Sequence, residues 1–181
     1  MKDIYILLTK SKTWVSKMIG LTTDDFYTHA AISFDKNLTP CYGFSRKYAY
    51  SPLPANIQKE YLDDTFHRKQ KNIPCAVYKI TVEDDVYEKV KESVEKVFKN
   101  RRHYSFNIIG LILCRCGIAY KRKNKYFCSQ FVSSVLYENG VIHLTKDPSL
   151  VRPNDFTGFE ELKCVYEGKL NILREKLSLA N

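Results

Sequence analysis

The apolar positions of this chain follow two spacings, one typical of strands and one typical of helices. Short apolar or alternating runs predict strands over Ile4–Leu8, His29–Phe34, Thr39–Ser45, Cys75–Val82 and Glu161–Tyr166. Apolar positions three and four residues apart predict helices over Lys12–Leu21, Glu83–Asn100, Phe106–Ala119, Tyr126–Asn139 and Asn171–Leu179. Separated helices beside a largely antiparallel sheet indicate an α+β fold, and we expect a single domain over residues 1–181.

Two segments depart from these patterns. Phe106–Ala119 is apolar nearly all round and too short to cross a bilayer, so it is expected to be a buried core helix. The alternative is a lipid-contacting surface beside the basic run Lys121–Lys125. Between Lys47 and Pro74 the periodicity fades, which predicts a long irregular segment between two strands. Because long loops in small domains often cover binding sites, we expect this segment to border the substrate groove.

Composition excludes several classes of protein. Aromatic residues make up 13% of the chain, which excludes a disordered protein, and 7 Gly with 6 Pro exclude collagen-like and low-complexity sequences. With 29 Lys and Arg against 20 Asp and Glu, the net charge of +9 is compatible with nucleic acid, an anionic membrane or an acidic substrate. Since no RNA- or DNA-binding motif accompanies the charge, we expect no specific nucleic-acid partner.

The six cysteines are expected to be free thiols. The apolar run that follows Met1 is too short for a secretory signal, so we expect a cytoplasmic protein, with peripheral membrane contact as the alternative. The pair Cys114 and Cys116 has no second ligand pair at zinc-finger spacing, so no metal site is expected there.

Cys128 and His29 are the candidate chemical groups. Cys128 lies at the first turn of a predicted helix, where free N–H groups and the helix dipole favour a thiolate and an oxyanion on a bound carbonyl. His29 begins a predicted strand, and a strand holds an imidazole rigidly. A cysteine and a histidine are the minimum for thiol nucleophilic catalysis. A small buried cysteine and a structural histidine are the alternative interpretations.

Four blocks of sequence resemble one known group of enzymes. They are Thr28–Asp35, Tyr42–Tyr48, Lys125–Val132 and Leu150–Phe156. Their order resembles the circularly permuted papain-like NlpC/P60 superfamily, in which the histidine strand precedes the cysteine helix. That group includes the YiiX-like proteins and, more distantly, the lecithin:retinol acyltransferase group. The resemblance implies a papain-like NlpC/P60 fold with an antiparallel sheet packed against helices.

The resemblance also implies roles for particular residues. Cys128 would be the nucleophile and His29 the general base. A third polar residue, which orients the imidazole, often follows the histidine by about a dozen positions, and here that position is Cys41, a poor orienting group. Tyr42 and Ser45 are the neighbouring candidates, and we favour Tyr42 as the third catalytic residue. The alternative for Tyr42 is an ordinary core aromatic.

The expected activity is hydrolysis or acyl transfer at an amide or ester bond, through an acyl-enzyme on Cys128. The expected substrate is an acyl lipid, a peptide or an acylated amino compound. No cofactor is expected, because thiol acyl transfer needs none. The alternative is a binding module that holds a lipid or peptide in the same groove without turnover. The sequence leaves the oligomeric state open.

Overall fold

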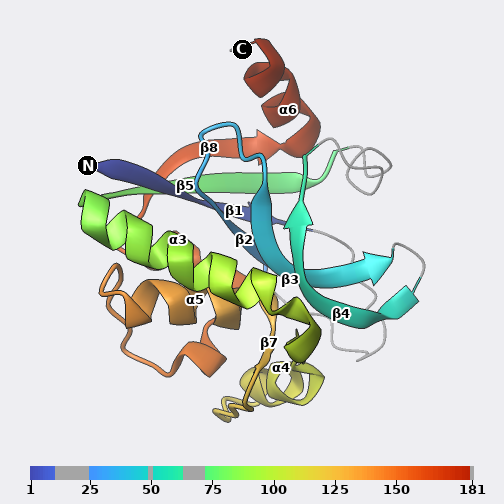
Figure 1. Cartoon of the computed structure of the whole chain (residues 1–181). Helices are drawn as coiled ribbons and strands as arrows, with labels where there is room; N and C mark the ends of the chain where they lie inside the picture. Colours follow the sequence, from blue (N-terminus) through green and yellow to red (C-terminus); the bar gives the residue numbers. More distant parts are fainter. Residues whose placement is uncertain (11–24, 49–50, 63–71, 180–181) are drawn as a thin grey trace.

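The computed structural model describes residues 1–10, 25–48, 51–62 and 72–179, and its centre is a six-stranded antiparallel sheet (Figure 1). The strands lie side by side in the order β4-β3-β2-β1-β5-β8. In chain order they are β1 (Lys2–Thr9), β2 (His29–Ser33), β3 (Cys41–Tyr48), β4 (Ser51–Glu60), β5 (Pro74–Val82) and β8 (Lys163–Lys169). The helices of the described residues are α3 (Asp84–Lys99), α4 (Ile108–Arg115), α5 (Cys128–Glu138) and α6 (Leu170–Leu179).

Shorter elements connect these parts. Two-residue strands β6 (Ser105–Phe106) and β7 (Lys125–Tyr126) pair in parallel, just before α4 and α5 respectively. The 3₁₀ helices in the described ranges are η1 (Arg101–His103), η2 (Pro148–Leu150) and η3 (Pro153–Gly158). Because β6 and β7 pair, the first residues of α4 and α5 lie close together although they are far apart in the sequence.

Side chains alternate between the two faces of the sheet and build two apolar clusters. The larger cluster joins Ile6, Ile32 and Phe44 of the sheet to α3 and α5. The smaller cluster lies on the other face, where Leu7 packs with Leu170 of α6. Figure 1 shows α3 and α5 on one side of the sheet and α6 at the opposite end of the molecule.

Helix α5 is enclosed by the sheet and by the η2 segment. Every residue from Cys128 to Leu136 is buried, including the expected apolar stripe. The buried hydroxyls are satisfied: Ser129 donates to the Val151 carbonyl at 2.7 Å, and Ser133 donates to the Gln130 carbonyl at 3.2 Å. A helix this well enclosed fixes the position of its first residue, Cys128.

Most predicted elements are confirmed, and two are corrected. The mixed α+β class and the antiparallel sheet hold, as do the strands and helices expected within the described residues. The segment Lys47–Pro74 is not irregular throughout, because its residues Ser51–Glu60 pair along β3 as the edge strand β4. The helix expected over Lys12–Leu21 lies outside the described residues.

The second correction concerns the apolar helix. It is shorter than predicted, and of its residues only Gly110 and Cys114 are buried. The expectation of a buried core helix is therefore wrong, because α4 lies on the surface with Ile109 48% exposed. No helix in the described part of the chain combines the length and apolarity that crossing a bilayer requires.

Strands β2 and β3 separate soon after they meet. Strands β2 and β3 pair only at Ile32 with Tyr42 and at Ser33 with Cys41, whereas all of β2 pairs with β1. The N–H of Ala30 lies beyond the last of these pairs and bonds to the Cys128 sulfur. The sheet thus leaves β2 accessible to the first residue of α5.

Candidate functional site

The start of α5 holds Cys128 in a fixed position. The residue is 7% exposed. The two residues before Cys128 are each held by a hydrogen bond. The Tyr126 carbonyl accepts the Asn107 N–H at 3.0 Å, and the Phe127 N–H donates to the Gln130 side chain at 3.4 Å. The thiol therefore lies at the N-terminus of a rigid helix, as predicted.

His29 lies beside the thiol on the first residue of β2. Its side chain hydrogen-bonds to Cys128 and is only 12% exposed. The structure thus brings together the two residues that the sequence singled out, although 99 positions of sequence separate Cys128 from His29. Because the other ring nitrogen, Nε2, faces a different partner, Nδ1 is the nitrogen available to the sulfur.

That other partner is Glu60, the last residue of β4. Its carboxylate oxygens lie 3.1 and 3.0 Å from His29 Nε2, and the Glu60 side chain is 11% exposed. A carboxylate on Nε2 fixes the tautomer and orientation of the imidazole and stabilises its protonated form. Cys128, His29 and Glu60 therefore form a continuous chain of hydrogen bonds from the thiol to the carboxylate.

The electrostatics of the pair favour charge separation. Burial by itself raises the pKa of the Cys128 thiol, but the hydrogen bond and charge of His29 and the N–H groups of Ala30 and Ser129 outweigh it, so the pKa falls below its ordinary value. Burial lowers the pKa of His29, but the Glu60 charge and the contact with Cys128 raise it well above 6.5. The two shifts together favour a thiolate and an imidazolium.

Gly43 provides the space in which this pair fits. A Cβ at this position would lie 2.9 Å from Glu60 Oε1, 3.2 Å from Ala31 Cβ and 3.3 Å from His29 Nε2. The first distance is shorter than real Cβ contacts allow. Any larger residue on β3 at this point would displace the carboxylate, so the absence of a side chain at position 43 is part of the site.

Tyr42, the expected third residue, does not contact His29. Its ring packs against Phe34 and Phe98, with centroid distances of 6.3 and 5.7 Å, in the cluster shared with α3. The reason is strand alternation: Gly43 faces His29, so the neighbouring Tyr42 points to the opposite face. The structure therefore corrects this choice, and the interpretation of Tyr42 as a core aromatic holds.

Glu60 is the member of the candidate site that the sequence patterns do not identify. In the β3–β4 register it lies directly opposite Cys41, the position at which the resemblance places the third residue. The carboxylate thus comes from the next strand. The sequence contains a signal for this strand, because apolar Ala55 and Ile57 alternate with polar Asn56 and Gln58 just before Glu60.

The first turn of α5 also offers a donor for an oxyanion. The Ser129 N–H bonds to the Cys128 sulfur, whereas the Cys128 N–H has no protein acceptor among the residues that the structure describes. An N–H at a helix N-terminus stabilises negative charge on a nearby oxygen. The Cys128 N–H is therefore suitably placed to donate to a substrate carbonyl oxygen that becomes negatively charged when a thiolate attacks.

The remaining cysteines lie in different environments. Burial raises the pKa of Cys41 and of Cys114, and raises that of Cys75 to about 12. Cys116 and Cys164 are exposed. No group of three His, Cys, Asp or Glu side chains in the described ranges is arranged to hold a metal ion.

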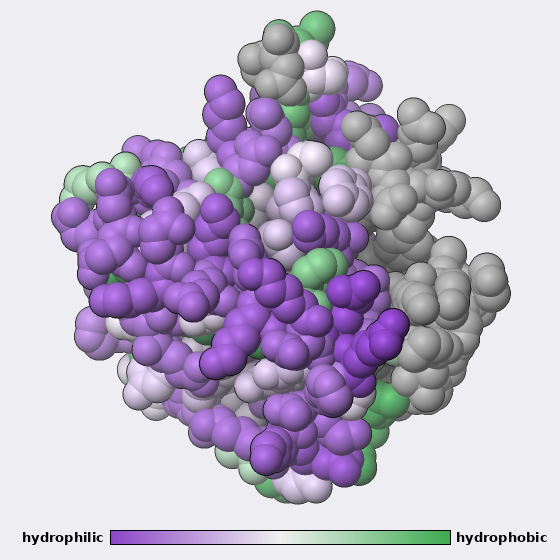
Figure 2. Space-filling model, viewed as in Figure 1, coloured by the Kyte–Doolittle hydropathy of each residue, from purple (hydrophilic) through white to green (hydrophobic). Residues whose placement is uncertain are grey.

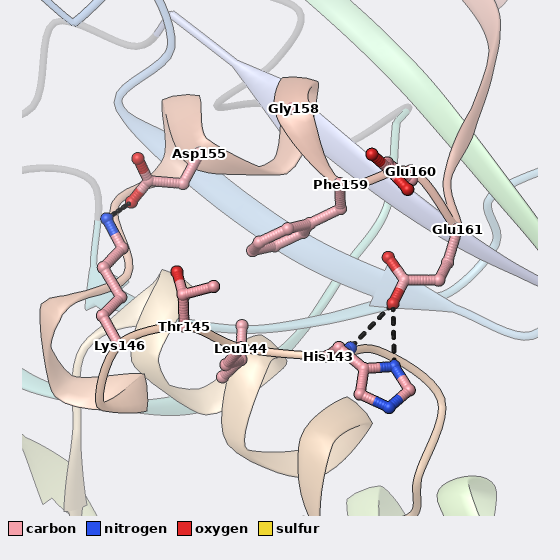
Figure 3. Close-up of a pocket in the computed structure, with 9 residues that line it drawn as sticks. All are labelled: His143, Leu144, Thr145, Lys146, Asp155, Gly158, Phe159, Glu160 and Glu161. Carbon is pink, nitrogen blue, oxygen red and sulfur yellow. Dashed lines mark hydrogen bonds and ion pairs between the residues drawn. The ribbon is translucent and has the colours of Figure 1, made fainter.

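A separate surface hollow of about 390 Å³ lies between the segment after α5 and the η3 segment (Figure 3). Its walls carry two ion pairs, Lys146 with Asp155 at 2.6 Å and His143 with Glu161 at 3.4 Å, and Phe159 points into it. None of the residues of the Cys128 site lines it. Four of its charged or titratable side chains are paired with each other, and it contains neither Cys128 nor His29, so it is not the candidate site.

Comparison of the chain with protein-family models, with curated proteins and with solved structures finds no match.

Proposed function

We propose that this protein is a cysteine-dependent hydrolase or acyltransferase that acts on an amide or ester bond through an acyl-enzyme on Cys128. The observation that carries the proposal is the hydrogen-bonded chain of Cys128, His29 and Glu60 at the start of a buried helix. A nucleophile, a base and a group that orients the base are the components that thiol acyl transfer requires.

In the first half of the proposed reaction the Cys128 thiolate attacks the carbonyl carbon of the substrate. The bond between sulfur and carbon forms, and the carbonyl electrons move to the oxygen, which accepts the Cys128 N–H. When the tetrahedral intermediate collapses, the amine or alcohol leaves with the proton of the His29 imidazolium. The products of this half are a thioester on Cys128 and a neutral imidazole.

In the second half His29 acts as a base. It removes a proton from water, or from an acceptor alcohol or amine, whose oxygen or nitrogen then attacks the thioester carbon. The carbon–sulfur bond breaks, and the thiolate and imidazolium are restored. Glu60 holds the ring in place throughout, and its negative charge stabilises the imidazolium that exists before each cycle.

The finer fold assignment belongs to the same proposal. In the papain-like NlpC/P60 superfamily that the sequence resembles, the permuted members place the histidine strand before the cysteine helix. Here β2 carries His29 and precedes α5 with Cys128. This order, together with the antiparallel sheet packed on α5, supports a circularly permuted papain-like domain.

A panel of p-nitrophenyl esters, from acetate to palmitate, tests the proposal with intact-protein mass spectrometry. We expect release of p-nitrophenol together with an added acyl mass that maps to the peptide containing Cys128. Cys128→Ala should abolish both signals, whereas Cys164→Ala, at an exposed cysteine outside the site, should preserve both. Binding of the esters without release or acylation would favour the non-catalytic binding module instead.

A further inference from the structure

The chain concentrates its positive charge in one acid-free segment. From Lys99 to Tyr137 there are eight Lys and Arg residues and no Asp or Glu, so this segment alone carries +8 of the net charge of +9. It includes η1, α4, β7 and most of α5. Since α5 is buried and Arg115, the one charged residue of α4, pairs with Asp25, the other charges lie at the end of α3, in η1, in the turn before β7 and in β7 itself.

Exposed isoleucines lie within the same segment. Ile109 and Ile112 of α4 are 48% and 36% exposed, and Ile118 just beyond the helix is 52% exposed. Three large aliphatic side chains on one short stretch form an unusual surface for a small protein. In Figure 2 hydrophobic atoms interrupt the hydrophilic surface at the lower end of the molecule, where Figure 1 places α4.

The basic side chains next to the isoleucines are largely uncompensated. Lys121 pairs with Asp147 at 2.7 Å, but in the described part of the chain no carboxylate lies within ion-pair distance of Arg122, Lys123 or Lys125. Arg122 and Lys123 are exposed. Apolar side chains flanked by unpaired positive charges are suited to the boundary between the headgroups and acyl chains of an anionic bilayer.

This surface is rigidly attached to the catalytic thiol. Asn107 caps α4 by accepting the Gly110 N–H at 3.0 Å, and its amide donates to the Tyr120 carbonyl at 3.2 Å and to the Gln130 side chain at 3.5 Å. Gln130 lies two residues after Cys128. One buried side chain therefore joins the start of α4, the loop that follows α4 and the first turn of α5.

The other end of α4 is tied to the histidine strand. Arg115 donates to Asp25 at 2.9 Å, and Asp25 is buried four residues before His29. With both ends of α4 fixed to the two elements that carry the site, the exposed isoleucines keep a constant position relative to Cys128.

We propose that Ile109, Ile112, Ile118, Arg122 and Lys123, named here the α4 patch, dock the protein on the surface of an anionic lipid bilayer. Charge complementarity identifies this occupant, because the patch combines exposed aliphatic groups with an acid-free basic segment. Docking itself does not depend on the thiol. The consequence of docking for the choice of substrate does rest on the proposed function. A docked enzyme holds Cys128 near the membrane interface, which makes an acyl lipid the substrate class.

Vesicle sedimentation with the Cys128→Ala protein tests the docking. We expect binding to equimolar phosphatidylcholine and phosphatidylglycerol, little binding to phosphatidylcholine alone, and release by high salt. The double variant Arg122→Gln, Lys123→Gln should lower the partition coefficient roughly 30-fold, about fivefold for each charge removed. The double variant Ile109→Ser, Ile112→Ser should lower it roughly 10-fold or more.

Matched controls lie on elements other than α4 and the segment that follows it. Ile172→Ser on α6 removes an isoleucine that is 41% exposed, and Lys163→Gln on β8 removes an exposed charge; neither should change binding. Thermal melts of every variant verify folding. Equal binding to both lipids, no binding to either, binding to duplex DNA in place of vesicles, or binding unaffected by both α4 variants would overturn the docking proposal.

A second readout separates docking from catalysis. With Cys128 intact, the double variant Ile109→Ser, Ile112→Ser should hydrolyse soluble p-nitrophenyl acetate at the wild-type rate, but a long-chain ester in anionic vesicles at least 10-fold more slowly. Equal loss on both substrates would contradict the docking role. Absence of activity in the wild type on either substrate would refute the enzyme while leaving the sedimentation result to decide docking.

Discussion

Gly43 offers the sharpest test of the site, because its substitution separates catalytic geometry from folding. In Gly43→Ala the new Cβ would meet Glu60 Oε1 at 2.9 Å, so the carboxylate must withdraw by about half an ångström to reach an ordinary contact. Misplacement of about 1 Å in a catalytic group costs roughly 100-fold in rate, so we expect about a 10-fold fall in kcat/KM. This fall in kcat/KM is expected because a displaced Glu60 carboxylate orients the His29 ring less firmly.

Stability should change little in the same variant. The atom that must move is Glu60 Oε1, at the end of a flexible side chain. The energetic cost of the small shifts of His29 and Ala31 is offset because alanine has less backbone freedom than glycine in the unfolded chain. We expect the free energy of unfolding to stay within about 1 kcal/mol of the wild type. The assays are ester turnover, Cys128 alkylation at pH 6 and urea denaturation.

The matched control is Gly158→Ala, where an added Cβ meets nothing within 4 Å. This change should leave the rate unaltered and keep the free energy of unfolding within about 1 kcal/mol of the wild type. Wild-type turnover in Gly43→Ala would show that the contact between Glu60 and His29 does not matter for catalysis. A loss of more than about 3 kcal/mol of stability would show instead that Gly43 serves the fold.

Four further expectations follow from the site and the core. Iodoacetamide should modify Cys128 near pH 6 roughly 100-fold faster than the exposed Cys116 and Cys164, because an ordinary thiol, with a pKa of about 8.5, is mostly protonated there. Peptide mapping identifies the modified cysteine. Equal rates at the three cysteines would refute a thiolate at Cys128. His29→Ala should move that rate profile to higher pH and abolish turnover, whereas His143→Ala, at an exposed histidine away from the site, should do neither. Glu60→Gln should lower the pKa of His29 and shift the alkaline limb of the turnover profile to lower pH. Because the pKa of His29 in the folded protein lies above the unfolded 6.5, the stability that His29 contributes is complete below pH 6.5 and disappears as pH rises through the folded pKa. This variant should therefore lose more stability at pH 6 than at alkaline pH, and a loss independent of pH would contradict the assigned charge pair. Leu136→Ala, at a fully buried position of α5, should cost about 2–5 kcal/mol in urea denaturation, and a loss below about 1 kcal/mol would show that α5 packs loosely.

The sequence predicted the site only as far as local patterns reach. Cys128 and His29 could be identified because a helix start and a strand start are local features. The third residue depends on how β3 and β4 align, and alternation turns an error of one position into the opposite face of the sheet. Local patterns therefore favour Tyr42, whereas in the structure its neighbour Gly43 faces the histidine and Glu60 supplies the carboxylate.

The apolar helix shows a different limit of sequence patterns. An all-apolar run predicts burial when the composition of the helix alone is considered. Burial depends on whether other elements cover the helix. Asn107 and Arg115 hold the ends of α4 and the helix contacts η2, but of its own residues Gly110 and Cys114 alone are buried. Periodicity carries no information about the number of neighbours, so the exposure of Ile109 had to come from the structure.

The place of Glu60 on an edge strand has a kinetic consequence. Within the described residues β4 pairs with β3 alone, so the acid is held by one ladder of hydrogen bonds and not by two. Edge strands open locally at a lower free energy than the centre of a sheet. Each such opening withdraws the partner of His29 while leaving Cys128 on its enclosed helix. The fraction of molecules in which His29 keeps its carboxylate partner thus depends on β4. Amide hydrogen exchange along β4 should therefore follow the reactivity of the Cys128 thiol, which lies in a distant part of the chain.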